Sequence, residues 1–339
     1  MTLYIIYGTV TNKNFEMIVY LNNMKNGLHC SAGYNWFSIG SEGRVSTCNS
    51  LIYRKDAYLG NIIKDDIKLR TDEFGFRCPN QECLQVCDRH WARKKVYKNN
   101  IETDYQEIIN LDPYQNKNRA VSILFAPTWK CNYSCKYCTL PTKETYPDIP
   151  DVCDQFTAEQ WIEAFTRFFE TNGIDGGIWH TNGGEPLYYN GIEKLFTFFS
   201  QKNFKIALTS NISADVFKKI VMAAPPESFG AINCSLHPTD KNFRWELYKS
   251  RVELLKSFNY PVSVNFVGHP DQLMLTQTYA DWCNSIGVNF ALIPMVGTFD
   301  GINFPTVEDY PLPLKNIIKK FTTKNLSDEN KFIEGERVG

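Results

Sequence analysis

The 339-residue chain carries 36 Lys and Arg against 37 Asp and Glu, which gives a formal net charge of -1 at pH 7. This balance offers no electrostatic basis for binding nucleic acid or an anionic membrane. No apolar run approaches the roughly 20 residues of a spanning helix, and the first residues lack the basic start and cleavage site of a signal peptide. In such a chain, eleven cysteines indicate metal or cluster ligands that are kept reduced. We therefore expect a soluble cytoplasmic metalloprotein, long enough for two domains.

The first 105 residues are rich in cysteine and in short strand-like segments. Alternating or apolar residues at 3–10 and 16–21 predict one hairpin. Between Cys30 and Cys48 lies a turn-rich segment with Gly43 four residues before the second thiol. This spacing predicts a hairpin that brings two thiols together, with Gly43 at the turn. Three further cysteines follow: Cys78, Cys83 and Cys87.

The region 119–300 alternates between strand and helix patterns, after a polar linker at 106–118. Strands are expected at 121–126, 177–181, 205–209, 231–236, 262–267 and 289–293. Helices are expected at 158–170, 191–201, 214–222, 242–258 and 272–286. The clearest helix begins after Thr157, the predicted N-cap, with Gln160 completing a capping box. Six consecutive βα units predict a parallel sheet with right-handed crossovers. The tail, 301–339, is irregular apart from a short basic helix at 314–321.

Two motifs follow expected strands of this series. Cys131, Cys135 and Cys138 form a C-x3-C-x2-C motif after the first strand. Three thiolates from one loop can hold one inorganic centre, but they are one short of the four that close a cubane Fe–S cluster or a structural zinc site. A centre with an open position is suited to bind and activate a ligand. After the second strand comes Gly183-Gly184-Glu185-Pro186, in which glycines permit close backbone approach to a ligand and the carboxylate can pair with an ammonium group.

Together, the two motifs resemble those of the radical SAM superfamily. The resemblance implies an α/β fold with a partial (β/α)6, TIM-like barrel, and a [4Fe-4S] cluster on the three cysteines whose fourth iron is chelated by S-adenosylmethionine (SAM). It also implies that Tyr137 lies beside the adenine and that the GGEP motif contacts the methionine amino group. Further SAM contacts are implied at the carboxyl ends of later strands. These are Ser210, Asn211 and Ser235, on the ribose or carboxylate, and Pro294, flanking the adenine.

The N-terminal cysteines resemble the SPASM or twitch auxiliary-cluster domain of radical SAM maturases. The C-x12-G-x4-C spacing that starts at Cys30 fits the opening motif of that domain, C-x9-15-G-x4-C. In addition, Gly60-Asn61-Ile62 resembles its GN(I/L) segment, and Cys83-x3-Cys87 matches its C-x3-C. The resemblance implies one auxiliary [4Fe-4S] cluster with the ligands Cys30, Cys48 and Cys87, and either Cys78 or Cys83 as the fourth.

The chain departs from this pattern in two ways. A C-x4-C spacing, from Cys78 to Cys83, replaces the longer C-x2-C-x5-C run. The cysteine-rich region, 1–105, also precedes the radical SAM core, whereas the family usually places it after. A zinc knuckle made from the same cysteines is the alternative, because spacing alone does not separate Zn–S from Fe–S sites.

Two residues near the end of the fourth expected strand are candidates for catalysis. His237 suits a substrate-facing proton donor or acceptor, and Cys234 a hydrogen-atom donor; the alternatives are a hydrogen-bonded turn histidine and a structural thiol. We expect an oxidoreductase that abstracts a hydrogen atom from a peptide or protein side chain, leading to cross-linking, oxidation or epimerisation. Its electron donor would be a flavodoxin or ferredoxin. The alternatives are a radical SAM enzyme for a small metabolite or nucleotide, and a zinc-binding structural or interaction protein.

Overall fold

A computed structural model describes the parts of the chain that form its main sheet and covering helices. These are residues 29–30, 33–47, 57–69, 76–77, 93–94, 119–135, 138, 155–294, 297–299, 302–304 and 310–325. The expected hairpin at 3–10 and 16–21 lies outside the described residues. So do Cys48, Cys78, Cys83, Cys87 and Tyr137.

Nine of the described strands form one sheet, in the order β12-β11-β10-β9-β8-β7-β2-β3-β4. Its parallel series is β7 (Arg119–Phe125), β8 (Ile174–Thr181), β9 (Phe204–Ser210), β10 (Phe229–Leu236), β11 (Val262–Gly268) and β12 (Asn289–Pro294). All six predicted strands are present, and the prediction of an α/β fold on a parallel sheet is confirmed. Two smaller sheets join β1 (His29–Cys30) to β5 (Phe76–Arg77) and β6 (Arg93–Lys94), and β13 (Gly297–Phe299) to β14 (Ile302–Phe304).

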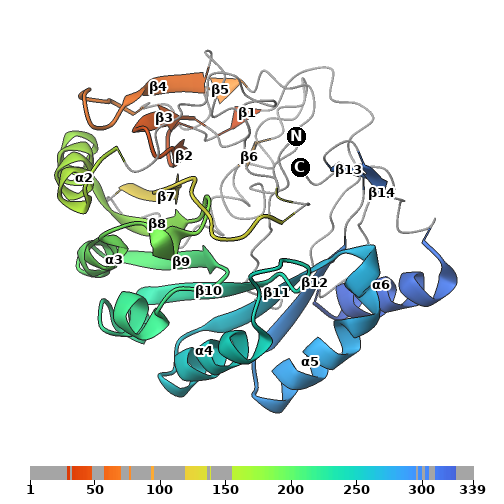
Figure 1. The fold of residues 1–339 in the computed structure, drawn as a ribbon. Helices are drawn as coiled ribbons and strands as arrows, with labels where there is room; N and C mark the ends of the chain where they lie inside the picture. The colour runs from red at the N-terminus through yellow and green to blue at the C-terminus, as the bar shows by residue number, and fades with distance from the viewer. Residues whose placement is uncertain are drawn as a thin grey trace.

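Helices lie along one side of the main sheet (Figure 1). They are α2 (Ala158–Asn172), α3 (Ile192–Ser200), α4 (Trp245–Ser257), α5 (Thr276–Ser285) and α6 (Leu312–Asn325). The predicted capping box is present, because Gln160 N donates to Thr157 Oγ1 at 3.3 Å and Thr157 N donates to Gln160 Oε1 at 2.9 Å. Short turns occupy Pro186–Tyr188, Phe217–Val221, Pro226–Ser228 and Pro270–Leu275.

Three expected helices differ from those observed. The helix expected at 214–222 is a single π-helical turn, Phe217–Val221. The one expected at 242–258 begins later, at Trp245, because the side chain of Asp240 accepts from Asn242 N at 2.8 Å and holds the preceding residues in a turn. The one expected at 272–286 starts as a 3-10 segment behind Pro270 and becomes α-helical at Thr276.

Aromatic side chains fill the layer between the sheet and the first two helices. Phe37 packs on Phe168 of α2 with ring centroids 5.2 Å apart, and Trp179 stacks on Phe199 of α3 at 4.1 Å. Such pairs add about 0.5–1.5 kcal/mol each to the burial of apolar area. Because side chains alternate along a strand, this packing assigns Trp36 and His180 to the opposite face. Their rings lie 6.0 Å apart, in agreement with that assignment.

Three N-terminal strands extend this sheet beyond β7. The strand β2 (Trp36–Ile39) pairs in parallel with β7, and β3 (Arg44–Ser46) and β4 (Tyr58–Asn61) follow antiparallel. The predicted hairpin turn at Gly43 is confirmed, with φ +83°. The guanidinium of Arg167 on α2 donates to the backbone oxygen of Ile62 at 2.7 Å, which ties the segment after β4 to the same helical layer.

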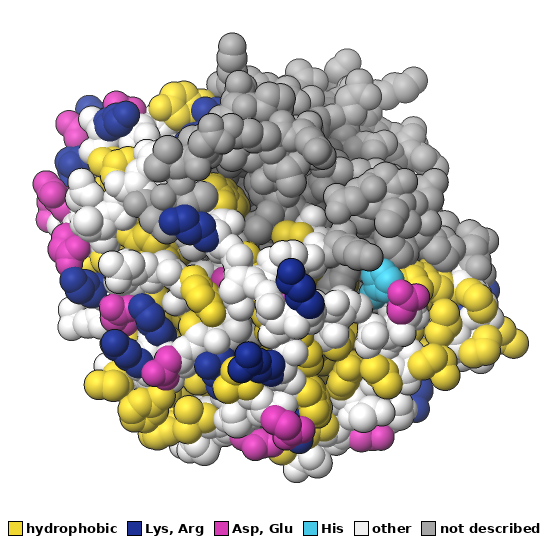
Figure 2. Space-filling view, in the orientation of Figure 1, with side chains coloured by type: hydrophobic (Ala, Val, Ile, Leu, Met, Phe, Trp, Pro, Cys, Tyr) yellow, Lys and Arg dark blue, Asp and Glu magenta, His cyan; other side chains and the backbone are white. Residues whose placement is uncertain are grey.

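The described surface carries mixed charges. Figure 2 shows basic and acidic side chains interspersed over the visible face, in line with the formal net charge of -1. None of the helices in the described part of the chain has the length and apolar character that crossing a membrane requires.

Two strand glycines provide a matched test of this packing. Gly177 in β8 has φ +143°, and a Cβ there would lie 1.9 Å from the backbone oxygen of Val121 in β7. At Gly230 in β10, the nearest atom to a Cβ would be 3.6 Å away, an ordinary contact. We expect Gly177→Ala to lower the free energy of unfolding by more than about 3 kcal/mol, and Gly230→Ala to change it by less than about 1 kcal/mol. Urea titration measures both, and equal effects would contradict the β7–β8 geometry.

Candidate functional site

The loop that carries the three cysteines leaves the carboxyl end of β7 and rests on the loop after β8. Gly184 N donates to Thr128 O at 2.9 Å, and Glu185 N donates to Lys130 O at 2.8 Å. A Cβ on Gly184 would lie 2.1 Å from Lys130 O, and one on Gly183 would lie 2.6 Å from Thr128 O. From the motif alone, these glycines are expected to let the backbone approach a ligand closely. In the structure, they let the GGEP loop approach the backbone of the cysteine loop closely.

The backbone and one side chain around Cys131 direct N–H groups at its sulfur. Tyr133 N lies 3.4 Å from Cys131 Sγ, and Asn211 Nδ2 lies 3.8 Å from it. The turn between the other two cysteines is closed by Cys138 N, which donates to Cys135 O at 2.9 Å. Burial raises the pKa of the Cys131 thiol to about 11; the N–H of Tyr133 acts in the opposite direction, and nearby negative charge, first that of Glu185, raises the pKa further. A bound metal ion would instead favour the thiolate.

Three thiols on one loop, with N–H donors to a sulfur, are a donor set that fits an Fe–S cluster. Within the described residues, no three His, Cys, Asp or Glu side chains are already arranged around a common metal position. The fit therefore rests on the chemistry of the donors and on their place at the edge of the sheet.

Glu185 is the buried centre of the site, with 1% of its surface exposed. Its Oε1 accepts from Ser210 Oγ at 2.6 Å and from Leu187 N at 3.0 Å, and its Oε2 accepts from Asn211 N at 2.7 Å. Burial raises the pKa of this carboxyl to about 7, against the opposing effect of these hydrogen bonds. The carboxylate thus joins the loops after β8 and β9.

A polar network continues from the end of β9 to the cysteine loop. Asn132 Oδ1 accepts from Asn211 Nδ2 and from Ser213 Oγ, both at 3.0 Å. Between these two donors, the buried Ile212 has φ +48°, which is uncommon for a β-branched residue. Arg251 of α4 holds this conformation by donating to Ile212 O at 2.8 Å. Backbone strain of this kind is concentrated at functional sites.

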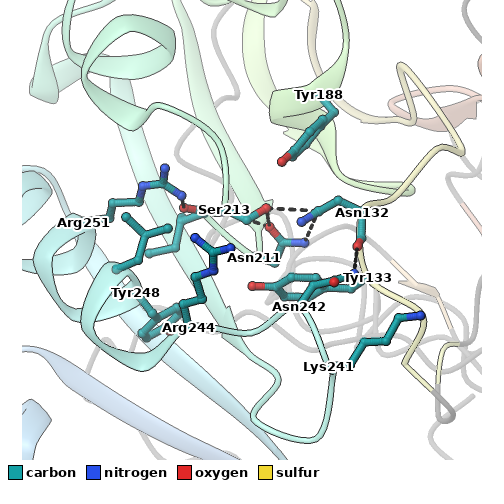
Figure 3. Close-up of a pocket in the computed structure, with 12 residues that line it drawn as sticks. Asn132, Tyr133, Tyr188, Asn211, Ser213, Lys241, Asn242, Arg244, Tyr248 and Arg251 are labelled. Atoms are coloured by element: carbon teal, nitrogen blue, oxygen red, sulfur yellow. Dashed lines mark hydrogen bonds between the residues drawn. The ribbon is translucent and has the colours of Figure 1, made fainter.

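A cavity of about 290 Å³ opens beside this network. It is lined by Asn132, Tyr133, Tyr188, Asn211, Ile212, Ser213, Lys241, Asn242, Arg244, Leu247, Tyr248 and Arg251. Three of these twelve residues are cationic and none is acidic. Figure 3 shows Asn132, Asn211 and Ser213 pointing toward one another, with Arg244 and Arg251 beside them and the Tyr188 hydroxyl directed at the group from the other side. The cavity suits a small ligand with an anionic end.

The two candidates on β10 and just after it lie in different surroundings. Cys234 is fully buried in the hydrophobic core, and its backbone oxygen accepts from Tyr248 Oη at 2.8 Å. Burial raises the pKa of its thiol, so Cys234 has the surroundings of a structural cysteine. His237 lies against the ring of Tyr133 in the cysteine loop, with centroids 6.2 Å apart and the planes perpendicular. Burial lowers the pKa of His237 to about 4, against the attraction of Asp240, so that it is neutral at pH 7.

The structure brings together part of the residue set expected from the sequence. Glu185, Ser210 and Asn211 converge beside Cys131, whereas Ser235 is buried on the neighbouring strand. Pro294 ends β12, and its side chain is not described. Of the residues that line the cavity, sequence reasoning named only Asn211 and missed the others, including the cations Lys241, Arg244 and Arg251. Asn132 and Tyr133 carried a signal, because they lie within the cysteine motif. Lys241 and Arg244 precede α4, and Arg251 lies within it. The sequence-based prediction of ligand contacts considered only residues at the ends of strands.

Comparison with known proteins finds likeness in structure alone. No protein-family model matches the chain, and no curated protein matches it. Streptococcus suis SuiB bound to precursor peptide SuiA is 16% identical with a TM-score of 0.45, over 61% of this chain and 47% of SuiB. The protein anSMEcpe, with bound AdoMet and a Kp18Cys peptide, is 15% identical with a TM-score of 0.45, over 59% of each chain. Both matches thus cover less than two thirds of the neighbour. Such similarity describes part of a fold and does not assign an activity.

The raised pKa of Glu185 predicts a pH dependence of stability. Because the folded carboxyl keeps its proton up to about pH 7, its stabilising effect is complete below the unfolded pKa of about 4.3 and is lost as the pH rises through about 7. In cluster-free protein, we expect this group to lower the free energy of unfolding by about 3 kcal/mol between about pH 4.5 and 8. Glu185→Gln should flatten the profile, whereas Glu163→Gln, on the exposed side of α2, should leave it unchanged. Denaturant titrations across this range measure the slopes, and parallel profiles for all three proteins would contradict the assignment.

Proposed function

We propose that this chain is a radical SAM enzyme that abstracts a hydrogen atom from a side chain of a peptide or protein. One observation carries the proposal. The C-x3-C-x2-C loop after β7, the GGEP loop after β8 and a cationic cavity beside β9 meet at the carboxyl edge of one parallel sheet. Ligands of parallel α/β proteins bind at this edge.

In this proposal, Cys131, Cys135 and Cys138 hold a [4Fe-4S] cluster with one iron open to SAM. When bound, the cluster supplies the electron that cleaves SAM to methionine and a 5′-deoxyadenosyl radical. The N–H groups of Tyr133 and Asn211 stabilise the ligating sulfur of Cys131, since hydrogen bonds to sulfur tune such centres.

The amino-acid end of SAM matches the charges of the cavity. Arg244 and Arg251 supply guanidinium groups for its carboxylate. Glu185 accepts three hydrogen bonds, while an ionised carboxylate has about four lone-pair sites. An ammonium group near the remaining site would favour the ionised form of Glu185 and lower its raised pKa. Ser210, whose hydroxyl is occupied by Glu185, positions this carboxylate and is assigned no direct ligand contact.

Other residues of the site exclude water and manage protons. Tyr133, Tyr188 and Tyr248 form an aromatic wall of the cavity, which limits the access of water to a reactive radical. His237 is neutral at pH 7, and its role in the proposal is that of a proton acceptor beside the cysteine loop. Cys234 is assigned a structural role.

The auxiliary [4Fe-4S] cluster remains part of the proposal. Its ligands would be Cys30, Cys48 and Cys87 with Cys78 or Cys83, and zinc bound by the same residues is the alternative. A small metabolite or nucleotide is the alternative substrate. A short precursor reading frame beside the gene would favour the peptide.

The first experiment compares the reconstituted wild type with the triple variant in which Cys131, Cys135 and Cys138 are changed to Ala. We expect about eight irons in the wild type and about four in the variant, as two cubane sites require. With dithionite and SAM, only the wild type should form 5′-deoxyadenosine. About four irons in the wild type and none in the variant would show that the protein has no auxiliary Fe–S cluster. A folded wild type without iron or 5′-deoxyadenosine would overturn the proposed function.

A second prediction concerns the cationic wall. Arg251→Lys keeps the positive charge but loses the planar guanidinium that bonds Ile212 O. We expect its Kd for SAM to rise about 10-fold or more. Lys249→Met, on the same helix but paired with Glu246 outside the cavity, should leave the Kd within about twofold. Isothermal titration with SAM measures both, and equal effects would mean that the cavity does not bind SAM.

A further inference from the structure

The β2–β3 hairpin turn lies at the same edge of the sheet as the cysteine loop. Because β2 runs parallel to β7, its carboxyl end is next to the point where that loop begins. Ala126 N, the first residue past β7, donates to Ile39 O at 2.9 Å. The turn from Gly40 to Gly43 therefore follows β2 at the edge assigned to SAM and substrate.

This turn carries a buried carboxylate. Both side-chain oxygens of Glu42 are inaccessible to solvent, and neither accepts a hydrogen bond from any residue that the structure describes. Burial raises the pKa of Glu42, and the positive charge of Arg44 acts in the opposite direction. The guanidinium of Arg44, however, lies over the ring of Tyr58, 4.4 Å from its centroid. Burying a carboxylate without hydrogen bonds destabilises the folded protein, so the retention of Glu42 calls for a function.

The turn is built to hold this side chain against Gly40. A Cβ on Gly40 would lie 2.5 Å from Glu42 Oε2, so any larger residue at position 40 would displace the carboxylate. The side chain of Asn61 donates to Glu42 O at 2.9 Å and fixes the turn from β4. A Cβ on Gly43 would lie 2.7 Å from Asn61 Oδ1. The Gly43 turn and the Gly60-Asn61-Ile62 segment, two features singled out in the sequence, thus meet at Glu42.

The carboxylate continues a column of polar groups on the sheet face opposite the helices. Trp36 and Ser38 lie on that face, and the alternation of β2 places Gly40 on the same side. The indole nitrogen of Trp36, the hydroxyl of Ser38 and the amide nitrogen of Asn233 on β10 are also buried, and within the described part of the chain they have no hydrogen-bond partner. Several unsatisfied polar groups on one face indicate a surface that becomes complete only with a polar ligand bound.

Glu42 also reaches the cysteine loop. The indole N–H of Trp129 and the hydroxyl of Ser41 lie near enough to lower its pKa, although neither attains hydrogen-bond geometry. Trp129 stands two residues before Cys131. The carboxylate is therefore next to the proposed reaction site and is separate from the Arg244–Arg251 side of the cavity.

We propose that Glu42 is a specificity-determining residue that pairs with a cationic group of the substrate, an ammonium or a guanidinium. This inference rests on the proposed function for the identity of the reaction, but the binding it describes is measurable without turnover. A cation would donate the hydrogen bonds that the carboxylate oxygens of Glu42 do not receive. Such charge-assisted hydrogen bonds offset the cost of burying the carboxylate. The substrate class is then a peptide that presents a lysine or arginine side chain, or an N-terminal amine.

The test uses the reconstituted full-length protein and minimal probes. Binding of n-butylammonium and n-butylguanidinium is measured by calorimetry, with the neutral n-butanol as the matched probe. We expect wild type to bind at least one cation and not the alcohol, and Glu42→Gln to weaken that binding about 10- to 100-fold. Glu163→Gln, on exposed α2, should bind as wild type does. We also expect Glu42→Gln to melt a few degrees higher, since it removes an unpaired buried charge.

A second variant keeps the test decisive. Glu42→Asp retains the charge on a shorter side chain, so it should bind the cation more tightly than Glu42→Gln, and its circular dichroism reports whether the turn still folds. Equal binding by wild type and both Glu42 variants, or no cation binding by wild type, would overturn the inference. Iron content and 5′-deoxyadenosine formation in wild type test the proposed function separately. Their loss alongside Glu42-dependent cation binding would leave a binding site on a protein with another activity.

Discussion

The site depends on the contact between two loop backbones at the carboxyl ends of β7 and β8. Two N–H···O bonds join residues 184 and 185 to residues 128 and 130, and side chains on Gly183 or Gly184 would force the loops apart. The cysteine loop therefore takes its position from the GGEP loop before any cofactor binds. Glu185, held in the same place by its backbone N–H, carries the constraint to β9 through Ser210 and Asn211. Two motifs that are separate in the sequence thus hold each other in position.

Charge is distributed in a complementary way around these two motifs. The cavity on the β9–β10 side has three cationic side chains, whereas the β2 hairpin on the other side offers the buried carboxylate of Glu42. The carboxylate of the cofactor and a cationic substrate group would approach the cysteine loop from different directions. This separation of charge favours correct placement, because a cationic substrate group would meet like charge at Arg244 and Arg251.

The parallel core was predictable from sequence, whereas the N-terminal strands and the cavity were not. The strands after residue 119 are apolar runs alternating with amphipathic helices, a local signal. The pairing of β2 with β7 depends on contacts between residues far apart in the chain, which periodicity does not encode. The spacing around Gly43 predicts a hairpin, and the hairpin is present. Its position in the main sheet follows only from the long-range pairing of β2 with β7. Arg251 was missed because a cation on an amphipathic helix has the pattern of a solvated residue, and only the fold turns it toward Ile212.

The parallel β2–β7 pair also has a consequence for biosynthesis. Trp36 pairs with Ser122, which is synthesised more than 80 residues later. At about 5–20 residues per second, Trp36 waits roughly 4–20 s for this partner. During that time Phe37 and Ile39, fully buried in the folded protein, have no sheet or α2 helix to cover them. A nascent chain with an early apolar strand awaiting a late partner is a natural client for a ribosome-associated chaperone. Slowing translation before residue 119 would therefore lengthen exposure and lower the yield of soluble protein.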